Sequence, residues 1–520
     1  KILLMRTEKK PLFNTGGIKL IYNTAQKQKE YFYSMLTPQE QALLKYIPTV
    51  NGLLDFAVEQ FADLPAISDG KVTYTYKELN ERVAIRRGYL QTLNFNQGDR
   101  IAVFAPNTLD AMELYLAIVT SGYVSVMLPS QLNNIALMRL CKKFDVSAVF
   151  YDNSLEKVAK TSGIEAYSTE FIQSNPLPPT DVTKDTICSI CLTGGTTGTP
   201  KGAVMTHGAI MRGAFNGCFI SGGVLQQRYI AILPLSHIFG LVKGFLSSLY
   251  TGGLTFECRN IKQAFVLIPV LKPTTLVLVP GMAEIIINLT NVKGRAYSES
   301  IKTMIIGAAP VPPKLMKAID DLGIQVLAGY GLTEGSNLTA GNKDVMSNLD
   351  SMGMIYPEQQ YKVVDGELRI KGDNLMNGYW SDEEATNQAF DEDGWLKTGD
   401  LAKVDENGYI YIVGRIKNLI ILPNGENVSP EELEEIFYKS EYVQDCLVKE
   451  DELNGKKVIG IEFLPNAEAV KNMNEEEIYN LFRQLVTETN KTLPTYKQIS
   501  KISIRKEDFK RTNAMKISRN

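Results

Sequence analysis

Short apolar runs alternate with helical patterns along most of this chain, beginning near Leu53. Strands that alternate with helices in this way predict parallel sheets covered by helices. The expected order is helix, strand, helix, strand, helix at residues 53–62, 72–76, 77–93, 100–106 and 109–123, followed by apolar strands at 147–152, 229–234, 274–280 and 302–308. Folds of this kind bind ligands at the carboxyl ends of strands, so the residues after each run are the first candidates for a functional site.

The pattern changes toward the C-terminus. Two extended stretches flank a turn that ends in Asn407-Gly408, a dipeptide that predicts a hairpin because it accepts positive φ. A helix is expected to begin at Pro430, capped by Ser429 and by a glutamate that bonds back to this cap. With 520 residues, at least two domains are expected. The predicted α/β fold has a peripheral N-terminal arm, a large domain with sheets covered by helices and a small mobile α+β C-terminal domain, at 1–50, 51–415 and 416–520.

Composition excludes several classes of protein. The 55 Lys and Arg against 58 Asp and Glu leave a net charge of −3, so no global positive charge favours nucleic acid or an acidic membrane. The longest apolar stretches are interrupted by Lys272, Pro273 and Pro280 before they reach the length of a membrane-spanning helix. The apolar run from Ile2 to Met5 is shorter than the core of a secretory signal. We therefore expect a cytoplasmic protein without a transmembrane segment.

Cysteine and histidine are too sparse to organise the fold or a metal centre. Six cysteines do not make a disulfide scaffold in a chain of this length. Cys188 and Cys191 form a CxxC, but they lie in an apolar strand in which positions three apart point to opposite faces, so two buried thiols are expected rather than a metal or redox pair. The only histidines are His207 and His237, and no protein-held zinc is expected.

The strongest local signal is the segment LTGGTTGTPKGAVMTH at residues 192–207. Its glycines let backbone N–H groups converge on an anion, its hydroxyls add donors, and Lys201 supplies a cation. The Gly-Lys-Ser/Thr of kinase and GTPase P-loops is absent, because Lys201 lies between Pro200 and Gly202. A flexible glycine loop is the alternative, and the length of the full string favours a polyphosphate site. The residues expected to bind phosphate are Thr193, Gly194, Gly195, Thr196, Thr197 and Gly198.

This segment resembles the signature of the acyl-adenylate-forming (AMP-binding) superfamily, which includes acyl-CoA synthetases, adenylation domains of peptide synthetases and beetle luciferase. Other segments resemble the remaining family motifs, in the family's order, from about residue 50 to the C-terminus. They are LPLSHIFG around His237, GAAP at 307–310, YGLTEG at 330–335, GYW at 378–380, DGWLKTGDLA at 393–402, GRIKNLIILPNGENVSPEELEE at 414–435 and KRTNAMKISRN at 510–520.

The resemblance implies a role for each motif residue. Tyr330, expected at a strand's carboxyl end, would stack on adenine, Thr333 would bind the α-phosphate, and Glu334 would hold the Mg²⁺ that accompanies ATP. Asp400 would accept the ribose hydroxyls and Arg415 would reach the nucleotide. A core aromatic, a solvated charge and a surface ion pair are the respective alternatives for Tyr330, Glu334 and the Asp400–Arg415 pair. Further residues expected at the nucleotide are Gly307, Ala308, Ala309, Pro310 and Gly331.

Three more residues take roles from the resemblance. His237 would orient the acid carboxylate, with a core histidine as the alternative. Lys516 would reach the α-phosphate and the carboxylate, and would act with Lys201 as a catalytic cation. Its context departs from the family pattern, because Met515 replaces the usual glycine. Lys417 matches the hinge about which the small domain turns.

The resemblance predicts an AMP-forming acid–thiol ligase. It would use ATP and Mg²⁺ to activate a hydrophobic acid, with a fatty acid as the main expectation, as acyl-AMP with release of pyrophosphate. It would then form acyl-CoA with coenzyme A. SHIFG and IILPNGENVSPEELEE resemble the long-chain fatty acyl-CoA ligase branch most. The alternatives are an adenylation enzyme that loads an acyl carrier protein, a catalytically impaired nucleotide-binding regulator, and a kinase-like transfer that forms ADP. No nucleic acid partner is expected, and the chain length of the acid and the oligomeric state, a homodimer included, stay open.

Overall fold

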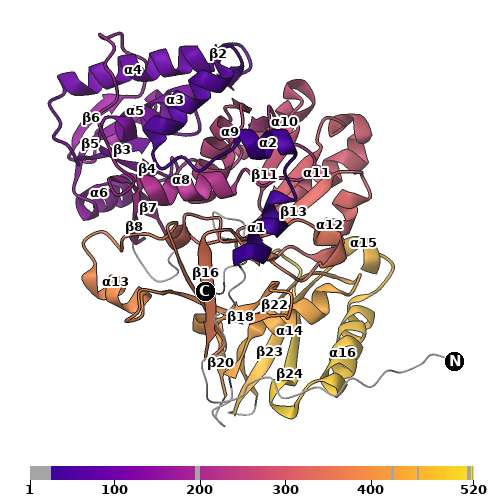
Figure 1. Ribbon diagram of the computed structural model, residues 1–520. Coiled ribbons are helices and arrows are strands. Elements are labelled where there is room, and N and C mark those ends of the chain that lie inside the picture. Colours follow the sequence, from indigo (N-terminus) through magenta and orange to yellow (C-terminus); the bar gives the residue numbers. More distant parts are fainter. Residues whose placement is uncertain are drawn as a thin grey trace. The chain divides into compact units, whose positions relative to one another are not determined.

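The computed structural model describes residues 25–193, 200–422, 427–453, 456–511, 517 and 519. The chain divides into two compact units. The larger is built mainly from residues 25–359 and 372–391, and the smaller from 360–371 and 392–508. Each unit contains strands and helices, as Figure 1 shows, and the α/β class predicted from the alternation is confirmed.

One sheet of the larger unit has the order β6-β5-β3-β4-β7-β8, and among its described strands only β7 and β8 pair antiparallel. Helices α4 (Tyr76–Thr92) and α5 (Leu109–Thr120) lie on one face and α6 (Asn134–Lys143) lies on the other (Figure 1). The strands read as continuous apolar runs because both faces are covered. They are β3 (Arg100–Phe104), β4 (Val124–Leu128), β5 (Val146–Tyr151), β6 (Glu165–Ser168), β7 (Ile187–Leu192) and β8 (Gly202–Thr206).

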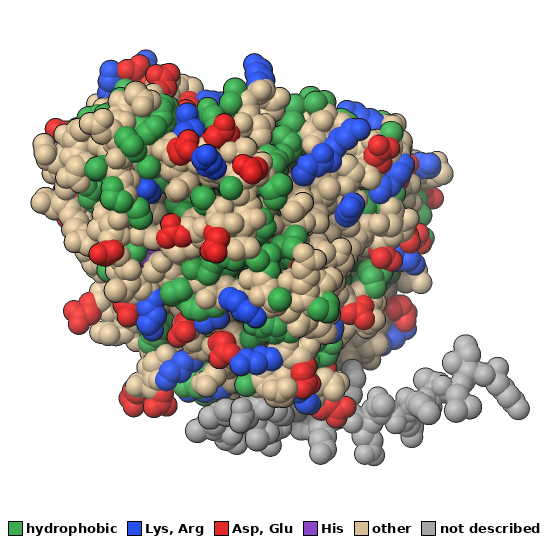
Figure 2. Space-filling model, turned by 45° about the horizontal axis from the view of Figure 1, so that its top comes forward, with side chains coloured by type: hydrophobic (Ala, Val, Ile, Leu, Met, Phe, Trp, Pro, Cys, Tyr) green, Lys and Arg blue, Asp and Glu red, His purple; other side chains and the backbone are tan. Residues whose placement is uncertain are grey.

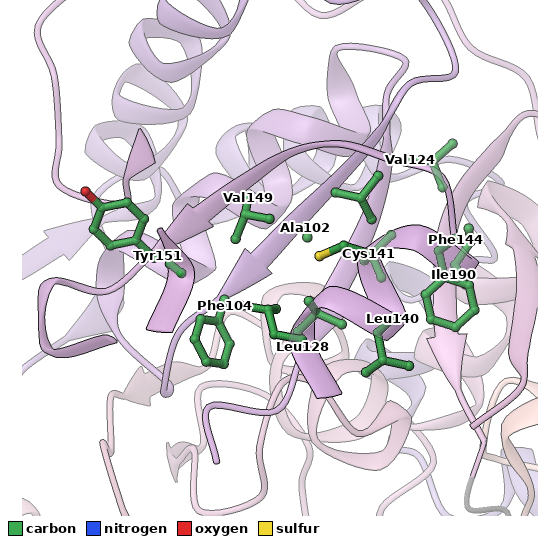
Figure 3. Packing of buried hydrophobic residues seen from close by; sticks show 14 residues of the cluster. Ala102, Phe104, Val124, Leu128, Leu140, Cys141, Phe144, Val149, Tyr151 and Ile190 are labelled. Atoms are coloured by element: carbon green, nitrogen blue, oxygen red, sulfur yellow. The ribbon is translucent and has the colours of Figure 1, made fainter. Parts of the chain in front are cut away.

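The core between this sheet and α6 follows from the alternation of side chains along a strand. Ala102 and Phe104 of β3 point toward α6, where they pack with Leu128, Leu140 and Cys141 (Figure 3). The intervening residues of β3 face α5, so every position of the strand is apolar and buried except its first.

A second sheet of the larger unit has the order β15-β14-β13-β12-β11-β9-β10-β1-β2. The strands from β13 to β1 run parallel, and those at both edges pair antiparallel. Figure 1 shows α11 (Pro280–Lys293) and α12 (Pro313–Asp320) on the side away from α8 (His207–Asn216). The strands are β1 (Pro65–Ser68), β2 (Thr73–Thr75), β9 (Arg228–Ile230), β10 (Leu254–Phe256), β11 (Thr275–Leu278), β12 (Thr303–Ile306), β13 (Gln325–Tyr330), β14 (Ala340–Asn342) and β15 (Met354–Ile355).

The remaining helices of the larger unit connect or cover these sheets. One of them, η2, is a π-helical segment that follows His237. They are α1 (Ala25–Tyr33), α2 (Pro38–Leu43), α3 (Val50–Phe61), α7 (Glu156–Ala159), η2 (Phe239–Leu246), α9 (Ser247–Tyr250), α10 (Ile261–Leu271), α13 (Glu383–Ala389), and the 3₁₀ turns η1 (Asn153–Leu155), η3 (Arg295–Tyr297), η4 (Thr333–Gly335) and η5 (Val345–Ser347).

Residues 25–50 do not form a peripheral arm, contrary to our expectation. The side chain of Phe32 in α1 is 1% exposed. Its ring stacks on that of Tyr356, with centroids 4.3 Å apart, and lies 5.4 Å from that of Phe219. The partners of Phe32 are distant in sequence, so nothing within residues 25–50 indicates that these aromatics belong to the core of the larger unit.

The smaller unit contains a sheet of order β16-β17-β18-β19 and a sheet of order β22-β23-β24. The predicted hairpin is confirmed, because β18 and β19 pair antiparallel and Gly408 between them has a φ of 92°. Phe463 of the second sheet packs its ring against those of Phe437 and Phe482, which come from two helices. The elements are β16 (Gln359–Val364), β17 (Glu367–Gly372), β18 (Leu396–Val404), β19 (Ile410–Arg415), η6 (Ile416–Asn418), β20 (Ile420–Ile421), β21 (Asn427–Val428), α14 (Pro430–Tyr438), β22 (Val443–Leu453), β23 (Lys456–Pro465), α15 (Ala467–Val470), α16 (Glu475–Thr492), η7 (Thr495–Lys497) and β24 (Ile499–Ile504).

Helix α14 begins as predicted, but its capping differs in one bond. The Ser429 hydroxyl accepts the backbone N–H of Glu432, as a helix cap does. The carboxylate of Glu432 pairs instead with the ammonium of Lys497 at 2.6 Å and does not return to the cap. The Ser429 hydroxyl also donates to the carbonyl of Val413 at 2.7 Å, so the cap ties α14 to β19.

The prediction of two buried thiols at the CxxC is confirmed. All six cysteines are buried and free of disulfides. Burial raises the pKa of the Cys188 thiol to about 12, which keeps it protonated and unreactive at neutral pH.

Among the described helices, none combines the length and the apolar character that crossing a membrane requires. The face drawn in Figure 2 carries acidic and basic side chains interspersed with apolar and uncharged ones, in keeping with the small net charge.

Replacing Phe32 by Ala tests whether residues 25–50 belong to the core. We expect Phe32→Ala to lower the free energy of unfolding by about 3–5 kcal/mol, because it leaves a cavity beside Tyr356. Phe390→Ala serves as the control, since Phe390 is only half-buried and should lose less. Denaturant unfolding of both variants measures the difference. Equal losses would contradict a core position for Phe32.

Stability should also depend on the protonation of His207, the first residue of α8. The imidazole is fully buried, and its Nδ1 accepts the backbone N–H of Val50 at 3.2 Å. Burial lowers the pKa of His207 from 6.5 to about 4. The unfolded chain therefore binds a proton that the folded protein excludes, so this contribution is complete above about pH 6.5 and is lost as the pH falls toward about 4, by on the order of 3 kcal/mol.

The measurement is the free energy of unfolding as a function of pH, for the wild type and for His207→Gln. The variant should be less stable at neutral pH and should lose less stability between pH 6.5 and 4.5. Parallel curves for the two proteins would exclude His207 as the titrating group.

Candidate functional site

The glycine- and threonine-rich loop connects the antiparallel strands β7 and β8. Leu192 of β7 pairs with Gly202 of β8, and the backbone N–H of Thr193 donates to the carbonyl of Lys201 at 2.9 Å. This bond closes the base of the loop and fixes the position of the Lys201 backbone. The predicted phosphate ligands Gly194, Gly195, Thr196, Thr197 and Gly198 lie outside the described residues, so their role stays a prediction.

The segment that carries the GYW motif runs beside β8. The backbone N–H of Val204 donates to the carbonyl of Gly378 at 2.9 Å, and the N–H of Trp380 donates to the carbonyl of Gly202 at 2.8 Å. These bonds make residues 377–380 a further extended stretch alongside the strand that leaves the loop.

Tyr379, at the centre of this segment, links two predicted site residues. Its hydroxyl donates to Glu334 Oε1 at 2.7 Å, and Lys201 Nζ lies 4.7 Å from the centroid of its ring. Burial and the neighbouring carboxylate of Glu334 raise the pKa of Tyr379 well above its usual range, so the phenol remains a donor. We did not predict Tyr379 as a site residue, although the GYW motif was the signal that marks it.

The YGLTEG motif lies at the carboxyl end of β13, as predicted. Tyr330 is the last residue of the strand, and Thr333 and Glu334 begin η4. A Cβ on Gly331 would lie 1.1 Å from the carbonyl oxygen of Asn337, so only glycine fits where the loop folds back on itself. The loop thereby turns Glu334 toward Tyr379.

The residues around Glu334 fit a magnesium ion that accompanies ATP. Glu334 is half-buried and offers a carboxylate, the ligand type that Mg²⁺ prefers. No cluster of three or more His, Cys, Asp or Glu side chains suitable for a metal occurs in the described part of the chain. Mg²⁺ is commonly held by one or two carboxylates together with substrate phosphates, and a single glutamate fits that pattern.

The GAAP motif follows β12. The backbone N–H of Gly307 donates to the carbonyl of Leu278 at 3.1 Å. Ala308 has a φ of 67°, a left-handed conformation that is unfavourable for alanine. Ala309 and Pro310 continue from this bend. Their contacts with a nucleotide stay a prediction.

A narrow, partly open cavity of about 40 Å³ is lined by residues of both motifs. Gly307 and Ala308 line it together with Tyr330 and Gly331. Its walls are mostly apolar and aromatic, and one charged side chain, Lys243, reaches it. The aromatic residues of the wall are Phe32, Phe219, Phe239, Tyr330 and Tyr356.

The apolar stretch from Ala264 to Leu289 lies outside the cavity wall. The stretch forms most of α10, β11 and the first part of α11, and none of its residues lines that cavity. The wall residue Phe32 was missed because it lies far from the motifs in sequence.

His237 lies just before η2 and is half-buried. Its Nδ1 accepts the backbone N–H of Phe239 at 3.2 Å. In the neutral ring this bond leaves the proton on Nε2, which is then a donor. Its predicted role toward the acid carboxylate is compatible with this geometry and stays a prediction.

Asp400 and Arg415 belong to the smaller unit, where they face each other on β18 and β19. Arg415 Nε lies 2.6 Å from Asp400 Oδ1, and Asp400 is 1% exposed. The two residues therefore form an ion pair in which the carboxylate is buried and the Arg415 side chain is 39% exposed, and their roles toward the nucleotide stay predictions. Lys417 lies in η6, directly after β19, and its role as a hinge stays a prediction. Lys516 is outside the described residues.

Comparison with known sequences identifies two matching families. The family model of AMP-binding enzymes matches residues 54–380, and that of the AMP-binding enzyme C-terminal domain matches residues 417–520.

Curated relatives resemble most of the chain. The feruloyl-CoA synthase of Amycolatopsis sp is 30% identical over 404 residues, covering 74% of this chain and 82% of the relative. The 2-succinylbenzoate–CoA ligase of Bacillus anthracis (strain A0248) is 26% identical over 412 residues, with the same two coverages of 74% and 82%. The mitochondrial medium-chain acyl-CoA ligase of Mus musculus is 28% identical over 486 residues, covering 79% of this chain and 78% of the relative.

Solved structures share the fold. The anthranilate CoA ligase AuaEII in complex with anthranoyl-AMP has a TM-score of 0.81 at 19% identity, covering 92% of this chain and 97% of the other. ATP-bound MatB from Rhodopseudomonas palustris has a TM-score of 0.79 at 22% identity, with coverages of 90% and 97%. At these identities the likeness concerns the fold, whereas the family model spans more than half of the sequence. The chain belongs to the family of AMP-binding enzymes.

Proposed function

We propose that this protein is an acid–CoA ligase that activates a hydrophobic carboxylic acid, fatty acids included, as an acyl-adenylate and then transfers the acyl group to coenzyme A. The observation that carries the proposal is the arrangement around Tyr379, which holds a cation and a carboxylate beside the base of the glycine-rich loop. A carboxylate with Mg²⁺ and a lysine are the groups that stabilise charge on a polyphosphate.

The first step joins the acid to AMP. A carboxylate is a poor acyl donor because its leaving group would be oxide. The acid oxygen attacks the α-phosphorus of ATP, a new P–O bond forms, and the bond to pyrophosphate breaks. Bound Mg²⁺ would neutralise charge on phosphate oxygens. Within the chain, Glu334 holds the position for the cation, Tyr379 orients Glu334, and Lys201 adds positive charge at the loop.

The second step transfers the acyl group. The thiol of coenzyme A attacks the acyl carbon of the mixed anhydride, a thioester forms, and AMP leaves with the bonding electrons. No side chain of the protein needs to act as a nucleophile in either step. The buried thiols agree with this, because burial keeps Cys188 protonated.

The cavity supports a hydrophobic acid. Gly307 and Tyr330 line it, and most of its lining residues are apolar or aromatic, the residue types that bind the body of an apolar ligand. The names of the relatives agree with an acyl group of moderate size, since they include a feruloyl-CoA synthase and a medium-chain acyl-CoA ligase. Coenzyme A is favoured over a carrier protein as the acceptor because these relatives are CoA ligases.

A product assay tests the proposed function. With ATP, Mg²⁺, a hydrophobic acid and coenzyme A, we expect AMP, pyrophosphate and an acyl-CoA thioester, each dependent on the acid. Formation of ADP would refute the adenylation chemistry. Acylation of a carrier protein in place of coenzyme A would instead support the alternative acceptor.

The role of Tyr379 is tested by removing only its hydroxyl. We expect Tyr379→Phe to lower the rate of acid-dependent ATP–pyrophosphate exchange about 10- to 100-fold, because Glu334 loses a hydrogen bond to a charged group. The variant should also require a higher Mg²⁺ concentration for half-maximal rate. Tyr167→Phe is the matched control, since the Tyr167 hydroxyl donates to the exposed Glu165 at 2.6 Å. An unchanged Mg²⁺ dependence in Tyr379→Phe would remove Tyr379 from the site.

A further inference from the structure

Lys243 places a positive charge at the cavity, and the proposed function gives this charge no role. It lies in η2 and is 3% exposed. It lines the cavity together with Gly217, and its ammonium donates to the Gly217 carbonyl. The same cavity is lined by Gly307 and Tyr330 of the two nucleotide-site motifs, so the charge shares one space with the end at which the acid would be activated.

This ammonium has no anionic partner in the part of the chain that the structure describes. The only hydrogen bond that Lys243 makes there is to the Gly217 carbonyl, although an ammonium has three protons to donate. Burial lowers the pKa of Lys243 to about 8, so the side chain is still mostly protonated at pH 7. A buried cation with one neutral acceptor is under-compensated, and an anionic or strongly accepting oxygen would stabilise it.

A structural role for Lys243 is the competing account. Gly217 follows α8, so its carbonyl lies at the negative end of that helix, where a cation is favourable. This contact gives one of the three ammonium protons an acceptor, and it accounts for the position of the side chain. It does not explain why the lysine borders a cavity, since a cap at a helix end functions equally well in solvent.

The backbone geometry around Lys243 is consistent with a ligand-binding site. Segment η2 is π-helical, a geometry that occurs frequently at functional sites. A Cβ on Gly240 would lie 2.4 Å from the carbonyl oxygen of Pro234, so this residue has to be glycine for η2 to pack where it does. The lysine is therefore held on a constrained segment rather than on a mobile surface loop.

We propose that Lys243 is a specificity-determining residue that selects acids carrying a second oxygen acceptor, most strongly a second carboxylate, at the end remote from the activated carboxyl. The inference rests on the proposed acid–CoA ligase function and narrows its substrate class. The apolar and aromatic wall binds the body of the acid, and the ammonium of Lys243 binds its remote oxygen. An acid that ends in a methyl group leaves this buried ammonium uncompensated.

The test uses the full-length protein and acids that differ only at the remote end. Two series, aliphatic and aromatic and of increasing length, each end in a methyl, a hydroxyl or a carboxylate group. We measure kcat and KM for acid-dependent ATP–pyrophosphate exchange and for thioester formation. At the best-fitting length, kcat/KM should be at least about tenfold higher with a remote carboxylate than with a methyl group, and the difference should lie mainly in KM. A preference for the hydroxyl over the carboxylate would identify a neutral acceptor.

Lys243→Met keeps the length and apolar stem of the side chain and removes its charge. In this variant the preference for the remote oxygen should disappear, while acids ending in a methyl group should be used as well as or better than by the wild type. Ser247→Ala is the matched control. Its hydroxyl donates to the carbonyl of Ala214 in α8 at 2.9 Å, so the variant loosens the same helix, and Ser247 does not line the cavity. This control should lose stability and keep the preference.

Each outcome decides the question. A wild type that uses methyl-ended acids as well as their oxygen-bearing partners refutes the inference and leaves the ligase function standing. A preference that persists in Lys243→Met refutes it as well. If no acid supports pyrophosphate exchange, the proposed function fails and the inference fails with it. Should Lys243→Met not fold, calorimetric binding of the same acids to the wild type replaces it, and equal affinities for the methyl and carboxylate members would refute the inference.

Discussion

The backbone pairing of residues 377–380 with β8 is the constraint on which the candidate site depends. These hydrogen bonds are independent of side chains, and they place Tyr379 beside the end of the glycine-rich loop. From there Tyr379 contacts Lys201 through its ring and Glu334 through its hydroxyl. Three motifs that are far apart in sequence thus meet around the Tyr379 side chain. The described side chains of Lys201 and Glu334 both contact Tyr379 and do not form an ion pair with each other, so both charged groups can still bind a ligand.

The cavity is lined by backbone in one part and by side chains in another. Glycines and a strained alanine at the carboxyl ends of β12 and β13 bring backbone close to one end of the space, whereas aromatic rings from α1 and other segments enclose it. Under the proposed function, the backbone-lined end would meet the group that all substrates share, because it has few side chains to vary. Substitutions in the wall, which is made of side chains, would then change which acid fits.

Several features could be predicted because they depend on neighbours in sequence. The strands and helices follow from local periodicity, the hairpin from Asn407-Gly408, and the buried state of Cys188 and Cys191 from the apolar run that contains them. The capping of α14 was predicted only in part, because the carboxylate of Glu432 found a distant partner in Lys497. The core position of Phe32 could not be predicted, since its partners lie about 190 and 320 residues further along the chain.

The sequence by itself determined the class of fold, the family and the order of the motifs, because each is written in short stretches whose spacing and residue types have direct physical meaning. Tertiary structure alone decided that Tyr379 joins Lys201 to Glu334, that Asp400 and Arg415 bind each other, and that Lys243 enters the cavity beneath an aromatic wall. The reason is that burial and charge pairing depend on which segments meet after the chain has folded. A local sequence pattern does not indicate which distant residue will become the partner.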